Sequence, residues 1–305
     1  MLILSSTKAW LHHPGKRVMR RSVEARAAYN RIARIVKWRT SAKSRQLLTG
    51  VDDRQRFEIK QDDGYATFGV DTIAPTSDVV AAASALFRSG TLQREGSKTQ
   101  LITYPVPIEG LSADSAYLRF ALDPVLLSGV ARYFGTAPIL TYIAVWESRS
   151  AAGSFNSSQL FHCDFEDQTQ MKVFVFCSDV TMDHGPLTVV SARDSRTIAD
   201  HVRYSFNKAS SYRVNDDDVA SAIPRTRWHA LMGPPGTVAL VDTTRCFHFG
   251  SRVTGADSSR LMAVFQYVTP FAFEFPLFFD SSLPFEGLAS TGAWSPIQRF
   301  ALSGK

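Results

Sequence analysis

Short, strongly apolar segments separated by turn residues are the feature of this sequence that most restricts its fold. They are rich in Val, Ile, Phe and Tyr, and Gly, Pro, Asp or Ser bounds each of them. They lie at 141–146, 172–177, 187–190, 237–242 and 261–268. This pattern predicts β-strands, and many short strands in one chain favour a barrel or a double-sheet jelly roll.

Helices are predicted before the strands. Asp123 and Pro124 supply an N-cap and a first helical residue, and Gly135 closes that helix about three turns later. A second helix is predicted over 79–87, with Asp78 as its N-cap. The expected fold is therefore mainly β with flanking helices, and 305 residues are enough to bury a core without a metal or disulfide.

The charge is divided unevenly along the chain. Residues 1–48 hold 12 of the 34 lysines and arginines but one of the 28 acidic residues, which leaves the remainder of the chain acidic. We therefore predict two parts, a basic, partly helical N-terminal arm (1–48) and one catalytic-size domain (49–305). The domain has a core at about 112–270 and a Phe-rich tail at 271–305. The net charge of +6 comes from the arm, so we expect no nucleic-acid partner.

The arm allows three interpretations. The segment 18–38 has an imperfect apolar stripe at helical spacing among many arginines. Such a helix can lie on an anionic membrane surface, can belong to an organelle transit peptide, or can pack on the domain as an ordinary solvated helix. No apolar run is long enough to span a bilayer, and the three cysteines lack metal or disulfide spacing. We expect a cytoplasmic protein, with membrane contact limited to the inner surface.

The segment Phe161-His162-Cys163-Asp164 carries the first candidate metal ligands. In an extended chain, residues two apart project to the same face, so His162 and Asp164 can bind one ion while Cys163 points away. A further histidine, His248, follows the predicted strand at 237–242. Two histidines and a carboxylate form the facial triad of non-haem Fe(II) oxygenases. Alone, His-x-Asp is too short to identify such a site, because a strand histidine and a turn carboxylate also produce it.

Longer runs make the pattern specific. The run QLFHCDFEDQTQMKVFVFCSDVTMDHGPL (159–187) resembles the phytanoyl-CoA dioxygenase family of iron- and 2-oxoglutarate-dependent oxygenases. So do GPPGTVALVDTTRCFHFGSR (233–252) and the following RLMAVFQYVTP (260–270). The resemblance covers about residues 112–270 and includes the His-x-Asp, a Gly-Pro turn, the distal histidine and a later arginine.

This resemblance implies a double-stranded β-helix, a jelly-roll, cupin-like barrel. It implies Fe(II) held by His162, Asp164 and His248, with 2-oxoglutarate and O2 as cosubstrates. It also implies that Arg260 binds the distal carboxylate of 2-oxoglutarate. A guanidinium fork suits this role because it pairs with a carboxylate through two hydrogen bonds and stays charged.

Other residues near these runs are weaker candidates for the cosubstrate pocket. Arg252 is the rival of Arg260, but its predicted loop position favours a substrate contact or a surface pair. Ser251 could add a hydroxyl to the same carboxylate, although the family often places that hydroxyl one position earlier. Gln159 and Lys172 could line the pocket, or could be a barrel-rim residue and a snorkelling lysine. The polar segment 192–227 is predicted to be a loop over one mouth of the barrel.

The expected function is Fe(II)- and 2-oxoglutarate-dependent hydroxylation of a small organic or lipid-like substrate, with release of succinate and CO2. Desaturation and ring chemistry stay open within the family. The alternative from another class is a non-catalytic barrel that binds a ligand, or a membrane-associated partner through the arm. A zinc hydrolase on the same ligands would need a general base, and the sequence indicates none. The oligomeric state is not predicted.

Overall fold

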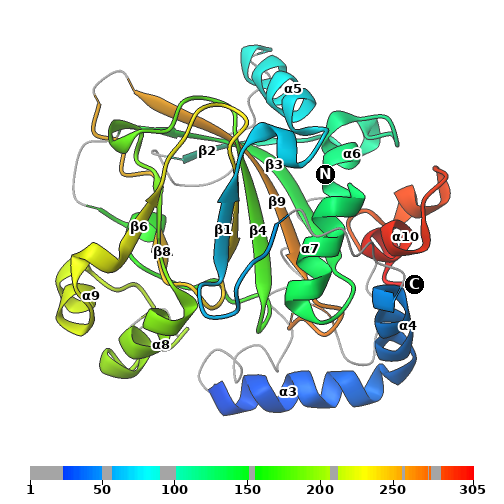
Figure 1. The fold of residues 1–305 in the computed structure, drawn as a ribbon, viewed down its shortest axis with the longest axis horizontal. Helices are drawn as coiled ribbons and strands as arrows, with labels where there is room; N and C mark the ends of the chain where they lie inside the picture. Colours follow the sequence, from blue (N-terminus) through cyan, green and yellow to red (C-terminus); the bar gives the residue numbers. More distant parts are fainter. Residues whose placement is uncertain are drawn as a thin grey trace.

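The computed structural model describes residues 23–49, 57–89, 101–150, 155–206, 212–255, 258–273, 275 and 283–305. The predicted helix at 18–38 begins outside these ranges. Two antiparallel sheets form the centre of the molecule, and helices surround them (Figure 1). The strands are β1 (Tyr65–Phe68), β2 (Leu101–Pro105), β3 (Ile139–Arg149), β4 (Gln170–Phe176), β5 (Leu187–Val190), β6 (Trp228–Leu231), β7 (Val238–Asp242), β8 (His248–Phe249) and β9 (Ser259–Val268).

The larger sheet has the order β1-β7-β4-β9-β3-β2, and the smaller has the order β6-β5-β8. Isolated antiparallel bridges extend the smaller sheet beyond β8, first from His248 to His162 and then from Phe161 to Val214. All five predicted strands are present within a few residues of their expected ends. The predicted fold class is confirmed: two antiparallel sheets form a double-stranded β-helix with helices on its outside.

Alternation along the strands sends neighbouring side chains to different layers. On β4, Met171, Val173 and Val175 belong to the core beneath the helices, whereas Phe174 and Phe176 belong to the core between the sheets. Residues two apart share a face, so Lys172 also points between the sheets. The same alternation on β9 turns Met262 and Val264 inward.

Helices cover the outer face of the larger sheet and its lower edge (Figure 1). The α-helices of the described residues are, in chain order, α3 (Val23–Val36), α4 (Trp38–Thr49), α5 (Thr76–Arg88), α6 (Ala116–Ala121), α7 (Pro124–Phe134), α8 (Ala192–His201), α9 (Asp216–Ala222) and α10 (Pro296–Ser303). The predicted caps of α7 are confirmed, because the Asp123 carboxylate accepts from two backbone amides and Gly135 is left-handed, with φ of 62°. The N-cap prediction for Asp78 is wrong. Helix α5 starts at Thr76, three residues earlier than predicted, and Asp78 lies in its first turn and pairs with Arg119 at 2.7 Å.

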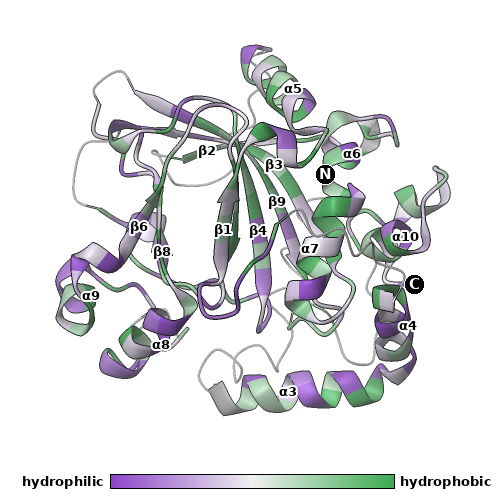
Figure 2. Cartoon of the chain, viewed as in Figure 1, coloured by the Kyte–Doolittle hydropathy of each residue, from purple (hydrophilic) through white to green (hydrophobic). Residues whose placement is uncertain are grey.

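The described part of the arm packs on the domain. In α3, Tyr29 and Ala33 are buried, and the Tyr29 hydroxyl donates to the carbonyl of Phe275 at 2.5 Å. The Arg26 guanidinium lies 4.1 Å from the ring centroid of Phe206, and it donates to a buried backbone carbonyl. Figure 2 shows hydrophilic and hydrophobic residues alternating along α3. Ordinary packing on the domain therefore accounts for the inner face of this helix.

The opposite face of the arm remains apolar and exposed. Ile35 is 72% exposed and Trp38 is 61% exposed. Within the described ranges, no helix combines the length and apolar character that crossing a bilayer requires.

The segment 192–227 was expected to be a loop, and this prediction is wrong for its described residues. Helices α8 and α9 lie beside the smaller sheet, each with a side-chain N-cap from Ser191 or Asn215. Their buried apolar residues are few, chiefly Ile198 and Val219. Their mean hydropathy is low, so the sequence of this segment resembles that of a polar loop.

Candidate metal centre and cosubstrate pocket

His162 and His248 are placed opposite each other by a reciprocal pair of backbone hydrogen bonds. The amide of each donates to the carbonyl of the other at 3.0 Å. Directly paired residues of an antiparallel bridge project to the same face, and the centroids of the two imidazole rings lie 4.3 Å apart. The sheet backbone therefore sets the spacing of the two histidines.

Asp164 joins them from the extended chain after His162. Its amide donates to the carbonyl of Thr243 at 2.7 Å, and its Oδ2 lies 4.0 Å from Nε2 of His248. One ligand atom from each of these three side chains lies within 4.8 Å of the others. Cys163, between the two candidate ligands, packs into a separate aromatic core. The predicted division of this segment into an inward and an outward face is thus what the structure shows.

Both imidazoles are held in the tautomer that suits a metal ligand. Nδ1 of His162 lies 2.8 Å from the carbonyl of Leu160, and Nδ1 of His248 lies 2.9 Å from the carbonyl of Cys246. A carbonyl can only accept, so each Nδ1 carries the proton and each Nε2 keeps its lone pair. Burial lowers the pKa of both histidines, which keeps them neutral. Hydrogen bonds of this kind orient metal-ligating histidines in proteins.

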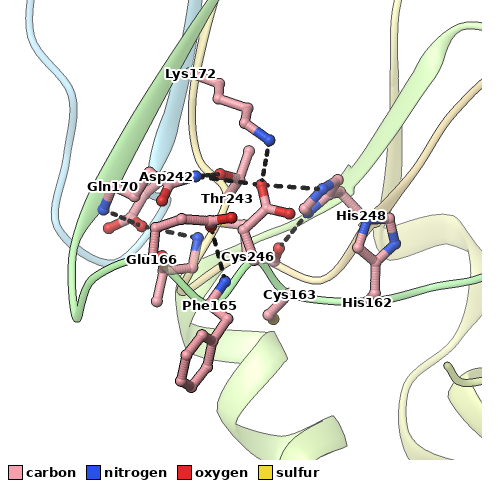
Figure 3. Close-up of polar contacts among 12 residues, drawn as sticks. His162, Cys163, Phe165, Glu166, Gln170, Lys172, Asp242, Thr243, Cys246 and His248 are labelled. Carbon is pink, nitrogen blue, oxygen red and sulfur yellow. Dashed lines mark hydrogen bonds and ion pairs between the residues drawn. The ribbon is translucent and has the colours of Figure 1, made fainter. Parts of the chain in front are cut away.

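Asp164 is ionised. Burial alone would raise the pKa of its carboxyl group, but the pKa is lowered, and the charge of Lys172 is the largest influence that opposes burial. The Lys172 ammonium donates to Oδ2 of Asp164 at 2.7 Å (Figure 3). The carboxylates of Asp164 and Glu166 in turn raise the pKa of Lys172 against its burial. The centre thus offers two neutral nitrogens and one carboxylate, the donor set of a facial triad.

A cavity of about 420 Å³ opens onto this triad. That volume is within the range of ligand-binding pockets. Its wall carries apolar side chains from both sheets, namely Leu101, Trp146, Phe174, Leu187 and Met262. Its charged side chains are Asp164, Lys172, Arg213 and Arg260.

Arg260 is a buried cation that faces no carboxylate of the described residues. Its guanidinium donates to the carbonyl of Gly185 and to the hydroxyls of Ser148, at 3.2 Å, and Ser251, at 3.4 Å. Its Nε has no partner. Burial lowers the pKa of Arg260 to about 10, still well above neutral pH. A charged group in this state is stabilised by an anion that binds in the cavity.

Arg252 is engaged elsewhere. Both of its terminal nitrogens lie 2.8 Å from the carboxylate oxygens of Asp216, and its guanidinium stacks 3.4 Å from the ring centroid of Phe249. Its Nε donates to the carbonyl of Gln159. Arg252 therefore holds α9 against the barrel, and it is not among the residues that line the cavity.

The remaining sequence candidates occupy different places. Ser251 lines the cavity, and its hydroxyl lies 2.8 Å from that of Ser148. Lys172 also lines the cavity, and its ammonium is bonded to Asp164. Gln159 lies behind the wall, where its amide nitrogen donates to the carbonyl of Ser251 at 2.9 Å and its oxygen accepts from Asn156.

Sequence reasoning did not single out Arg213, which lines the cavity, or Ser148, which bonds two residues that do. Ser148 bonds both Ser251 and Arg260, and it could have been found by extending the predicted strand at 141–146 by two residues. Arg213 lies in the segment that was interpreted as a loop, and no motif marked it. The backbone carbonyls that orient the two histidines leave no signal in a sequence.

No protein-family model and no curated protein match the sequence. Solved structures do. EctD from S. alaskensis, solved with 2-oxoglutarate and 5-hydroxyectoine, has a TM-score of 0.50 and 18% identity over 81% of this chain and 88% of that chain. The epimerase SnoN in complex with Fe3+, alpha ketoglutarate and nogalamycin RO has a TM-score of 0.49 and 19% identity over 81% and 92%. The likeness to EctD shows that this chain shares its fold.

Proposed function

We propose that this protein is an Fe(II)- and 2-oxoglutarate-dependent dioxygenase that hydroxylates a small organic substrate. One observation carries the proposal. A buried arginine without an anionic partner, Arg260, shares a cavity with two neutral histidines and an ionised aspartate. An anionic cosubstrate that bridges a metal and a guanidinium satisfies both halves of this cavity at once.

The residues present fit the metal. Nε2 of His162, Nε2 of His248 and one carboxylate oxygen of Asp164 would hold it, and the hydrogen bonds to Leu160 and Cys246 keep the two rings in place. When bound with 2-oxoglutarate, iron would supply O2 activation, so that one oxygen atom enters the substrate and the other enters succinate as CO2 is released. Lys172, which bonds Oδ2 of Asp164, would offset the negative charge of that carboxylate.

Arg260 would bind the distal carboxylate of 2-oxoglutarate. Its side chain enters the cavity from the start of β9 and is held by Ser148 and the Gly185 carbonyl. Ser251 would donate its hydroxyl to the same carboxylate. Gln159 would act as a positioning residue, because it bonds the backbone of Ser251 from outside the cavity.

The cavity wall would separate the reacting atoms from water. Trp146, Phe174 and Met262 place apolar surface beside the triad. Exclusion of water strengthens electrostatic interactions at the site and limits side reactions of oxidising intermediates.

Anaerobic titration with Fe(II) and then 2-oxoglutarate tests this function. The measurement is the weak visible charge-transfer band of the chelate, in the wild type and in His162→Ala. We expect a band that requires both components and is absent in His162→Ala. The matched control is His201→Ala, which removes an exposed histidine of α8 and should leave the band unchanged. A folded, metal-loaded wild type without the band would favour the non-catalytic binding barrel.

We also propose contact between the arm and anionic membranes, in keeping with the exposed Ile35 and Trp38 among basic residues. Deleting the whole arm would also remove Arg26 and Tyr29 from the core, so substitution is the better test. Ile35→Glu with Trp38→Glu should abolish cosedimentation with vesicles rich in phosphatidylserine. Equal sedimentation of this variant and the wild type would contradict the contact.

A further inference from the structure

We propose that Arg213 binds an anionic group, a carboxylate or a phosphate, on the substrate of this enzyme. The inference rests on the proposed function and names the substrate class that it left open.

The backbone register places Arg213 beside the triad. Phe161 and Val214 exchange hydrogen bonds of 3.0 and 2.9 Å in an antiparallel bridge. One step along each chain, this register sets Arg213 opposite His162, so both side chains project to the same face. Arg213 accordingly lines the same cavity as His162, His248 and Arg260.

Arg213 has no counterion among the described residues. It makes no hydrogen bond or ion pair with any of them, and its Nη1 is buried without a partner. Its guanidinium stacks on the ring of Tyr212, 4.4 Å from the centroid, which fixes its plane but leaves its N–H donors available. Two arginines that follow it in the chain are paired by contrast, Arg252 with Asp216 and Arg225 with Asp217.

When each cation of the cavity is matched with an anion, Arg213 is the one without a match. The lining residues include three cations and one carboxylate. Lys172 pairs with Asp164, and Arg260 would take the distal carboxylate of 2-oxoglutarate. Arg213 remains, and an anion in the cavity would give its buried Nη1 the acceptor that it lacks among the described residues.

Arg213 and Arg260 serve different parts of the cavity. Arg260 lies against Gly250, where a Cβ atom would be 3.4 Å from its Nη2, and it bonds Ser251 just beyond His248. Arg213 lies across the other histidine, on the side of the α8–α9 segment. A substrate anion on Arg213 would therefore hold the rest of the substrate beside the metal without competing for Arg260.

Calorimetric titration with three six-carbon probes tests the proposal: hexanoate, hexyl phosphate and the neutral hexanamide. Each is titrated into the protein as isolated, and again with Fe(II) and 2-oxoglutarate under anaerobic conditions. We expect at least one anion to bind about 10-fold more tightly than hexanamide, as a charge-assisted hydrogen bond would give. The stronger of the two anions identifies the group for which the site is built.

Arg213→Gln should remove this preference, whereas Arg213→Lys should keep part of it. The matched control, Arg225→Gln, changes an exposed arginine that does not line the cavity and is paired with Asp217, and it should retain the full preference. Equal binding of charged and neutral probes by the wild type, binding of none of them, or an unchanged preference in Arg213→Gln would overturn the proposal.

The two proposals fail separately. Arg213→Gln should keep the charge-transfer band with Fe(II) and 2-oxoglutarate, because Arg213 bonds none of the proposed ligands. Anion preference in a wild type that lacks the band would support the role of Arg213 and contradict the iron site. A charge-transfer band in a wild type without anion preference would support the iron site and contradict the role of Arg213.

Discussion

Two aspartates, Asp164 and Asp242, both accept a hydrogen bond from Gln170 and have opposite environments. The backbone amide of Gln170 donates to Asp242 at 3.3 Å, and its side chain donates to Asp164 at 3.4 Å (Figure 3). Asp242 also accepts from the Tyr133 hydroxyl at 2.9 Å and from the amides of Thr244 and Arg245. Asp164 instead faces Lys172 and two imidazole nitrogens that carry free lone pairs.

The difference separates a structural cluster from a ligand site. Around Asp242 every donor is supplied by the protein, and the closed network holds the turn that leads to His248. Around Asp164 the lone pairs and the nearby guanidinium of Arg260 stay available. Polar groups without partners lower the stability of the folded protein, and proteins retain them at sites that bind a metal or a ligand. The comparison predicts that substitutions in the two clusters have opposite effects.

The largest effect is expected from His248→Ala. Loss of one of three metal ligands should weaken Fe(II) binding at least about 100-fold, more than loss of an outer partner of a metal ligand. Competition with a chromophoric chelator measures this affinity, and circular dichroism checks the fold. Metal affinity within a few fold of wild type would show that His248 is not a ligand.

A somewhat smaller effect is expected from Arg260→Gln. The affinity for 2-oxoglutarate should fall about 100-fold, because a buried charge-assisted pair contributes about 2–3 kcal/mol, while Fe(II) affinity is kept. Arg252→Gln is the matched variant, and it should change 2-oxoglutarate affinity less than about threefold while weakening the packing of α9. Calorimetry on both proteins decides between the two arginines, and the reverse ranking would assign the carboxylate to Arg252.

Substitutions around Asp242 should change the stability of the fold and leave metal binding unchanged. Tyr133→Phe removes one hydrogen bond to Asp242 and should lower the free energy of unfolding by about 1 kcal/mol without changing Fe(II) affinity. Tyr65→Phe is its control, because the described residues show ring packing of Tyr65 on His229 and no hydrogen bond from its hydroxyl. Urea unfolding measures both. Lower metal affinity in Tyr133→Phe would show that the two clusters are not independent.

The smallest effect is a pH dependence of stability. Burial raises the pKa of Asp242 to about 6, against roughly 3.9 in an unfolded chain. Between about pH 4 and 6 the folded state keeps a proton that the unfolded state has lost. This group's contribution to the free energy of unfolding therefore falls as the pH rises. Asp242→Asn should remove that slope from urea-unfolding data, and an identical slope in both proteins would place the raised pKa elsewhere.

The sequence predicted the layout of the centre better than its surroundings. Strand alternation alone separates His162 and Asp164 from Cys163, and the later histidine and arginine follow from their order after a strand. The tautomers depend on the carbonyls of Leu160 and Cys246, which are backbone groups with no residue signature. Arg213 depends on an isolated bridge between segments about 50 residues apart, which local periodicity does not encode.

Helices α8 and α9 show why the fold was predicted only in part. Their capping residues, Ser191 and Asn215, were available signals, but each helix buries few apolar side chains. The bridge from Val214 to Phe161 anchors the chain just before α9. Tertiary contact rather than a local pattern thus brings Arg213 to the cavity.

A crystal structure with Mn(II) in place of iron and with 2-oxoglutarate tests the central claim most directly. The anomalous signal of the metal should lie between Nε2 of His162, Nε2 of His248 and the carboxylate of Asp164. The cosubstrate should extend from the metal to Arg260, with Arg252 still on Asp216. A metal bound elsewhere, or 2-oxoglutarate bound away from Arg260, would contradict the account.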